Sequence, residues 1–190
     1  MFHWKNVSVN IRLNRIKTLN QRRYSMAETK LAGNPVSLAG DFPTKGSSIR
    51  NVSAIKQDLS PLSLDDFKDK RKVLNIFPSI DTDVCATSVR KFNQKASDMS
   101  NTVVICLSFD LPFAQKRFCG AEGIENVETG SLFRSIEVAK DMGLLIQDGP
   151  LAGLTARAVI VLDEQNTVLH AQLVDDIANE PDYEAALAVL

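Results

Sequence analysis

Three short runs of apolar, largely β-branched residues constrain the fold of this chain most. They occupy residues 73–77, 103–107 and 158–162, and they do not alternate between apolar and polar positions. A strand that is apolar on both faces suits a sheet that is covered on both sides. The runs therefore predict the inner strands of a layered α/β domain.

The sequence around these runs predicts the helices and hairpins that complete the fold. Val84, Ser88 and Phe92 have helical spacing, which predicts a helix over 84–97. Turn residues at 33–43 indicate an N-terminal hairpin, and a polar turn after the third run indicates a second hairpin. Proline and acids at 180–184 mark the start of a C-terminal helix. This order predicts an α/β fold with a mixed central sheet flanked by helices.

Length and composition exclude several classes of protein. A chain of 190 residues that is 44% hydrophobic and 24% charged fits one globular domain with a sizeable core. No apolar run reaches the roughly 18 residues of a membrane helix. Three cysteines do not make a paired disulfide framework, and two histidines are too few for a His-rich metal site. We therefore expect no membrane span and no His-rich metal site.

The charge distribution separates an arm from a body. Residues 1–25 hold six basic residues and no acid, which leaves 16 basic against 23 acidic residues in the rest. The acidic body is a poor ligand for nucleic acid or for an anionic membrane. The arm has three interpretations: a targeting peptide, a nucleic-acid arm, or a translated leader ahead of a true start at Met26. We favour the leader and expect the arm to be disordered, with the folded domain at 26–190.

The segment from Phe77 to Cys85 carries the most informative chemistry. It joins the end of an inner strand to the start of a helix, the edge at which ligands bind in open α/β sheets. A thiol in the first turn of a helix lies near unpaired N–H groups and the positive end of the helix dipole, and both favour the reactive thiolate. The alternative is a buried structural thiol. The polar turn before Cys85 argues against inert burial.

Other chemistries for Cys85 lack partners. A Cys–His pair needs a base, and His170 is the one histidine of the body; we interpret it as structural, on the polar side of a hairpin strand. A zinc site is disfavoured because Cys85, Cys106 and Cys119 lack paired close spacing. Redox chemistry is the class that remains.

Six motifs follow one another along the chain: Pro78–Cys85, Val89–Asn93, Asp110–Gln115, Arg117–Gly120, Gly149–Leu151 and Ala156–Val159. Together they resemble the peroxiredoxins, in particular the thiol peroxidase subfamily, over the chain from about Gly33 to its end. The resemblance implies a thioredoxin-like fold with an N-terminal β-hairpin. It also implies an enzyme that reduces hydrogen peroxide and alkyl or lipid hydroperoxides and is recycled by thioredoxin.

The resemblance also implies the roles of the site residues. Cys85 would be the peroxidatic nucleophile that becomes a sulfenic acid. Thr82 would direct its hydroxyl at the thiolate and the peroxide, and Arg157 would bring a positive charge from a neighbouring strand. Pro78 would shape the loop and shield the sulfur from water.

Cys119 would be the resolving residue, forming a disulfide with Cys85 within one chain. It lies on a short helix expected at 112–119. Because a disulfide needs α-carbons within about 7 Å, we expect local unwinding near one or both cysteines during turnover. Cys106, inside an inner strand, is expected to be a core thiol with no catalytic role.

Two smaller questions stay open in the sequence. Leu111, Pro112, Phe113 and Phe118 either line an apolar substrate mouth or belong to the core. Asp83 lies two residues from Cys85, where its carboxylate disfavours the thiolate if the charges approach; we expect it to point outward with a modest effect.

Three functions are therefore weighed. The first is a thioredoxin-dependent hydroperoxide reductase that acts in antioxidant defence and redox homeostasis, cytoplasmic and homodimeric. The second is a peroxide-sensing redox signalling module whose disulfide changes the binding of a partner. The third, a thioredoxin-like binding domain without activity, is disfavoured by the combination of Thr82, Cys85, Cys119 and Arg157.

Overall fold

The computed structural model describes residues 28–50 and 52–190. The expected extension 1–25 and the expected start at Met26 lie outside the described residues. Within the described part of the chain, no helix combines the length and the apolar character needed to cross a membrane.

A seven-stranded mixed sheet forms the centre of the domain, in the order β10-β9-β5-β6-β7-β3-β4. The inner strands β5, β6 and β7 are mutually parallel, and β9 runs antiparallel to β5. The strands that complete the two edges pair antiparallel. The strand bounds are β3 (Ser53–Ile55), β4 (Pro61–Ser63), β5 (Arg71–Ile76), β6 (Thr102–Ser108), β7 (Glu128–Ser131), β9 (Ala158–Leu162) and β10 (Val168–Leu173).

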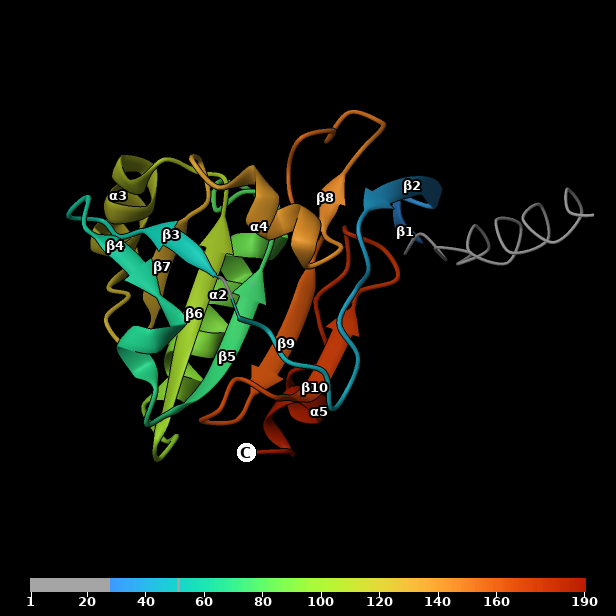
Figure 1. Cartoon of the computed structure of the whole chain (residues 1–190). Coiled ribbons are helices and arrows are strands. Elements are labelled where there is room, and N and C mark those ends of the chain that lie inside the picture. The colour runs from blue at the N-terminus through green and yellow to red at the C-terminus, as the bar shows by residue number, and fades with distance from the viewer. Residues whose placement is uncertain (1–27, 51) are drawn as a thin grey trace, which may run out of the picture.

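Helices cover both faces of this sheet. In Figure 1, α2 lies behind the sheet and α4 lies in front of it. The helix bounds are η1 (Leu64–Phe67), α2 (Asp83–Ala96), α3 (Pro112–Glu122), α4 (Ile136–Asp141) and α5 (Tyr183–Leu187). Side chains of α2, α3 and α5 share one apolar cluster, and those of α4 belong to a second cluster.

Successive residues of the inner strands alternate between these two clusters. Along β9, Val159 and Val161 lie in the cluster of α2, whereas Ala158, Ile160 and Leu162 lie in the cluster of α4. All five side chains are fully buried. Each inner strand thus has two apolar faces, which explains the uninterrupted apolar runs in the sequence.

A second, three-stranded sheet holds the N-terminal hairpin. Strands β1 (Glu28–Leu31) and β2 (Asn34–Ala39) pair antiparallel, and β2 pairs with β8 (Leu145–Ile146). The connecting residues Ala32 and Gly33 both have positive φ, 50° and 83°. Two successive residues of positive φ suit a two-residue hairpin, because their twist matches that of the flanking strands.

The structure confirms most of the strands, helices and hairpins that the sequence predicts. The third apolar run coincides with β9, the expected helix over 84–97 is α2, and both hairpins are present. The short strands β3, β4, β7 and β8 were not predicted. They hold two to four residues each, too few to establish a periodic pattern.

Candidate active site

The loop between β5 and α2 begins in the core and ends at the surface. Phe77 and Pro78 are buried, and the carbonyl of Phe77 accepts a hydrogen bond of 2.7 Å from the buried hydroxyl of Thr155. The next residues turn toward solvent before α2 begins at Asp83. Pro78 is therefore buried at the start of this loop, and its predicted shielding of the Cys85 sulfur stays a prediction.

Cys85 is the third residue of α2 and is fully buried. Its sulfur has two hydrogen-bond partners from separate elements. The Oγ1 of Thr82, the N-cap residue of α2, lies 2.8 Å from Sγ, and the Nη2 of Arg157 lies 3.3 Å from Sγ. The structure thus brings together the three residues to which the sequence resemblance gave the central roles.

Arg157 directs its positive charge at this sulfur from a buried position. Only 2% of the residue is exposed, and it lies directly before β9. Its Nε donates to the carbonyl of Ile177 at 2.9 Å. Nη1 is buried and has no hydrogen-bond partner among the described residues. The N–H groups on Nη1 therefore have no acceptor among the described residues.

A carboxylate that the sequence argument did not single out holds the loop in place. Asp110, between β6 and α3, accepts hydrogen bonds from the Ser79 hydroxyl (2.7 Å), the Ile80 amide (2.6 Å) and the Ser108 hydroxyl (2.7 Å). The buried amide of Gln115 donates in turn to Ser108 at 3.1 Å. The motif at 110–115 contained this residue, but no sequence pattern showed which loop its carboxylate would bind.

Cys119 lies on α3, in the same apolar cluster as Cys85, and is 6% exposed. Burial raises the pKa of its thiol above the ordinary value of 9.0. Two ion pairs at the surface join α3 to α2 and to the loop before it: Arg90 of α2 with Glu122 at 2.8 Å, and Asp81 of the loop with Arg117 at 2.7 Å. Cys85, Cys106 and Cys119 are all free, so this is the structure of the dithiol form.

Cys106 and His170 are not among the hydrogen-bond partners of the Cys85 sulfur in the described residues. Burial raises the pKa of Cys106 to about 12, although Asn75 lies 3.7 Å from its sulfur. His170 pairs with Val161 in the β9–β10 ladder, four residues beyond Arg157. At roughly 3.3 Å per residue this places it about 13 Å along the strand from the arginine.

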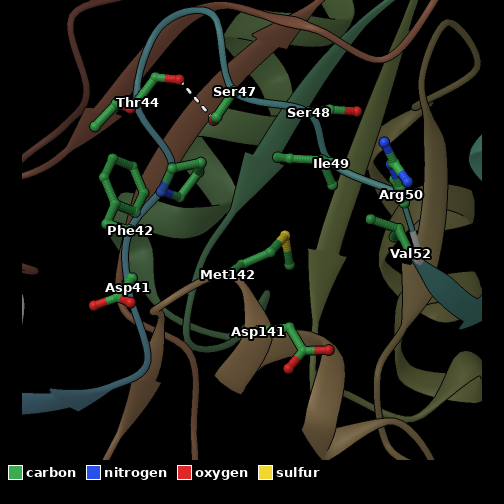
Figure 2. A pocket seen from close by; sticks show the side chains of 11 residues that line it. Asp41, Phe42, Thr44, Ser47, Ser48, Ile49, Arg50, Val52, Asp141 and Met142 are labelled. Atoms are coloured by element: carbon green, nitrogen blue, oxygen red, sulfur yellow. Dashed lines mark hydrogen bonds between the residues drawn. The ribbon is translucent and has the colours of Figure 1, made fainter. Parts of the chain in front are cut away.

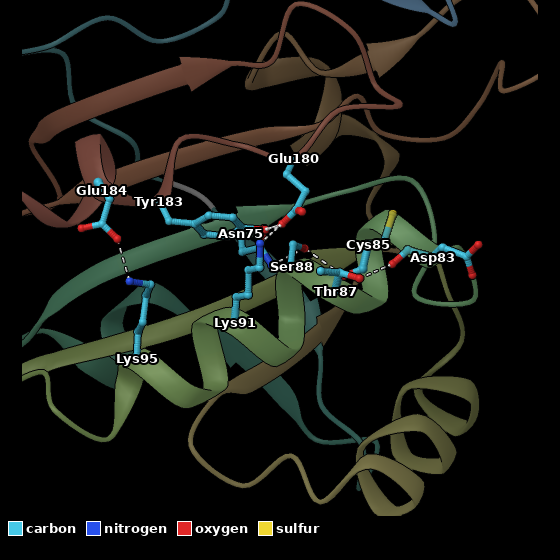
Figure 3. A network of polar contacts seen from close by, with 10 residues as sticks. All are labelled: Asn75, Asp83, Cys85, Thr87, Ser88, Lys91, Lys95, Glu180, Tyr183 and Glu184. Atoms are coloured by element: carbon cyan, nitrogen blue, oxygen red, sulfur yellow. Dashed lines mark hydrogen bonds and ion pairs between the residues drawn. The ribbon is translucent and has the colours of Figure 1, made fainter.

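The carboxylate of Asp83 projects away from the sulfur of Cys85 in Figure 3, and the residue is exposed. The same figure shows how the C-terminal segment is joined to α2. Lys91 forms a 2.7 Å ion pair with Glu180, and Lys95 forms a 2.8 Å pair with Glu184. These contacts hold the segment that begins α5 against the helix of the reactive cysteine.

The apolar residues at the start of α3 divide into two groups. Leu111 is 50% exposed and Phe113 is 63% exposed, whereas Pro112 and Phe118 are buried. The first pair therefore forms an apolar surface beside the loop that Asp110 anchors, and the second pair belongs to the core.

A cavity of about 440 Å³ lies apart from this site, between the loop 41–52 and the end of α4. Figure 2 shows its mixed lining of hydroxyl, carboxylate and apolar side chains. Its floor residues Ile49, Val52 and Met142 belong to the apolar cluster on the opposite face of the sheet from Cys85. Among the described residues, no cluster of His, Cys, Asp and Glu is arranged to hold a metal ion.

Comparisons with known proteins show the family to which the chain belongs. The Redoxin family model matches residues 44–187. A thiol peroxidase of Corynebacterium glutamicum is 51% identical over 165 residues, which are 87% of this chain and 99% of that protein. A solved peroxiredoxin-like protein of Aquifex aeolicus is 38% identical, with a TM-score of 0.79 over 85% of this chain and 95% of that one.

A solved thiol peroxidase of Chromobacterium violaceum is 22% identical and also has a TM-score of 0.79. The match covers 85% of this chain and 94% of that chain, and it supports the thioredoxin-like fold. The family match covers most of the chain, and the relative from Corynebacterium is matched over nearly its whole length. The chain therefore belongs to the Redoxin family, as a thiol peroxidase of the peroxiredoxin class.

Proposed function

We propose that the chain reduces hydrogen peroxide and organic hydroperoxides through Cys85 and returns to its dithiol form by way of Cys119 and thioredoxin. The observation that supports this most directly is the pair of donors on the Cys85 sulfur, Thr82 Oγ1 at 2.8 Å and Arg157 Nη2 at 3.3 Å. A hydroxyl and a guanidinium on one buried sulfur favour its thiolate, the nucleophilic form.

In the first step, the thiolate of Cys85 attacks the terminal oxygen of the hydroperoxide. The S–O bond forms as the O–O bond breaks, and the released oxygen leaves as water or an alcohol after taking up a proton. Cys85 is oxidised to a sulfenic acid and the peroxide is reduced by two electrons. Nη1 of Arg157, which has no hydrogen-bond partner among the described residues, would donate to peroxide oxygen as charge moves onto the leaving group.

In the second step, Cys119 as a thiolate attacks the sulfur of the sulfenic acid. The S–S bond forms and hydroxide leaves, which becomes water on protonation. Because Cys119 lies inside α3 with a raised pKa, this step requires part of that helix to open. The dithiol of thioredoxin then reduces the disulfide by exchange.

The surface beside the loop favours apolar substrates and partners. Leu111 and Phe113 expose half or more of their surface next to the residues that bind Asp110. We include alkyl and lipid hydroperoxides among the substrates for this reason. We place the contact of a homodimer at the same surface. We further propose that the protein is cytoplasmic and that it performs antioxidant defence without a metal or flavin.

The test is non-reducing peptide mapping by mass spectrometry after one equivalent of cumene hydroperoxide. We expect a Cys85–Cys119 link with Cys106 still free, and no peroxide consumption by Cys85→Ser. A stable sulfenic or sulfinic acid on Cys85 without a link removes Cys119 as the resolving residue. An unmodified Cys85 overturns the proposed reaction. Turnover that thioredoxin does not sustain favours a peroxide sensor instead.

A further inference from the structure

A short segment near the C-terminus lies between the N-terminal hairpin and the active site. This segment, residues 174–178, follows β10. The amide of Lys30 in β1 donates to the carbonyl of Asp175 at 2.9 Å, and the amide of Ile177 donates to the carbonyl of Lys30 at 2.7 Å. The backbone of the segment is therefore bonded to the hairpin in both directions.

Two side chains add to this attachment. The buried hydroxyl of Thr29 donates to the carbonyl of Val174 at 2.7 Å. The carboxylate of Asp176 accepts from the two turn amides of the hairpin, Ala32 at 3.0 Å and Gly33 at 2.7 Å. It also accepts from the amide of Ala178 at 2.9 Å, inside its own segment. These backbone bonds, led by that of Ala178, lower the pKa of Asp176, so its carboxylate is ionised at neutral pH.

The other side of the same segment holds Arg157. The carbonyl of Ile177 accepts from Nε of Arg157 at 2.9 Å, and the amide of Val174 donates to the backbone carbonyl of Arg157 at 3.0 Å. A guanidinium is planar, so a bond at Nε sets the plane in which both terminal nitrogens lie. The position of the Ile177 carbonyl thus determines where Nη1 and Nη2 point.

We propose that Asp176 is a positioning residue for peroxide reduction, because it ties the N-terminal hairpin to the segment whose Ile177 carbonyl orients Arg157 on Cys85. This role rests on the proposed function of Arg157. It gives the hairpin a part in the reaction, although the hydrogen-bond partners of the Cys85 sulfur in the described structure are Thr82 and Arg157, neither of them in the hairpin.

The chain offers a matched control for this proposal. Asp148 also anchors the hairpin through its carboxylate, which accepts from the amide of Ser37 at 2.9 Å and from its hydroxyl at 2.8 Å. It belongs to the loop after β8 and has no bond to the segment that holds Arg157. Asp148→Ala therefore loosens the hairpin on its other side without acting on the Ile177 carbonyl.

The experiment measures the second-order rate constant of Cys85 oxidation by stopped flow, in the full-length protein. We expect Asp176→Ala to lower it about tenfold, since small misplacements of a catalytic group are costly. Asp176→Asn, which keeps one acceptor oxygen, should retain part of the rate, and Asp148→Ala should stay within about twofold of the parent. Thr29→Val removes a different bond to the same segment and should also lower the rate.

A double-mutant cycle separates positioning from general weakening of the fold. In an Arg157→Met background, Asp176→Ala should change the rate constant by less than about twofold, because the group through which it acts is gone. An equal loss in both backgrounds, or an unchanged rate in Asp176→Ala and Thr29→Val, overturns the proposal. Failure of the parent protein to react with any hydroperoxide overturns instead the proposed function.

Discussion

The hydroxyl of Thr82 lies within hydrogen-bond distance of two acceptors. Its Oγ1 is 2.8 Å from the sulfur of Cys85 and 3.1 Å from the carbonyl of Ser79, yet a hydroxyl carries only one proton. With Cys85 as a thiol, the hydroxyl donates to the carbonyl and accepts from S–H. With Cys85 as a thiolate, the Thr82 hydroxyl rotates about its C–O bond and donates its proton in a hydrogen bond to the sulfur. One residue therefore serves both protonation states of the nucleophile without moving.

Replacing Thr82 tests this assignment. Thr82→Val keeps the shape and removes the donor, and we expect a loss of about 100-fold in the rate constant with peroxide, the usual effect of removing one preorganised donor. Thr82→Ser keeps the hydroxyl and should stay within about tenfold of the parent. Stopped-flow kinetics with hydrogen peroxide measures both. Equal rates for the valine and serine variants would contradict the role of the hydroxyl.

Asp83 should matter little despite its place in the sequence. Its exposed carboxylate points away from the sulfur, and exposed charges are strongly screened by water. We expect Asp83→Asn to change the rate constant by less than about twofold at physiological salt. A tenfold rise on neutralisation, measured in the same assay at two ionic strengths, would show that the charge acts on Cys85.

At the scale of elements, the sequence was sufficient to predict a strand or helix wherever its residues follow a repeating pattern. The apolar run that became β9 and the helical spacing that became α2 needed only local periodicity. The resemblance supplied Thr82 and Arg157, which the structure places on the sulfur of Cys85. Asp110 and the Ile177 carbonyl could not be found in this way. Their roles depend on which distant loops meet, and a backbone carbonyl has no sequence signal.

The position of Cys119 inside α3 leads to a prediction about pH. In the folded helix burial raises its pKa above 9.0, so the thiolate of Cys119 is scarce at neutral pH. If α3 opens before the attack, the thiol meets water and ionises near its ordinary pKa of 9.0. We expect the rate of disulfide formation, followed by quenched-flow alkylation, to rise with a midpoint near that value. A midpoint well above 9.0 would mean that the attack comes from the intact helix.

The whole molecule should lose stability in alkaline solution because its sheet buries a thiol on one face. Cys106 keeps its proton to about pH 12 in the folded protein, but loses it near 9.0 when unfolded. The unfolded state then binds fewer protons, so the free energy of unfolding falls by about 1.4 kcal/mol per pH unit in this interval. The raised pKa values of Cys119 and Tyr183 act in the same direction.

Urea titrations at several pH values above 9 measure this slope. Cys106→Ala should reduce this slope by the contribution of one thiol and leave peroxide reduction unchanged, because the Cys106 sulfur is hydrogen-bonded to Asn75 and not to Thr82 or Arg157. Identical slopes in the parent and the variant would show that Cys106 does not keep its proton in the folded state.

The bond between Thr29 and Val174 joins positions 145 residues apart. A ribosome adds about 5–20 residues per second, so roughly 7–30 s separate the synthesis of these two partners. Cys85, Thr82 and α2 are synthesised well before the segment 174–178, whose Ile177 carbonyl binds Arg157. We therefore expect a nascent chain to carry a slow thiol, and the fast reaction with peroxide to begin only after release.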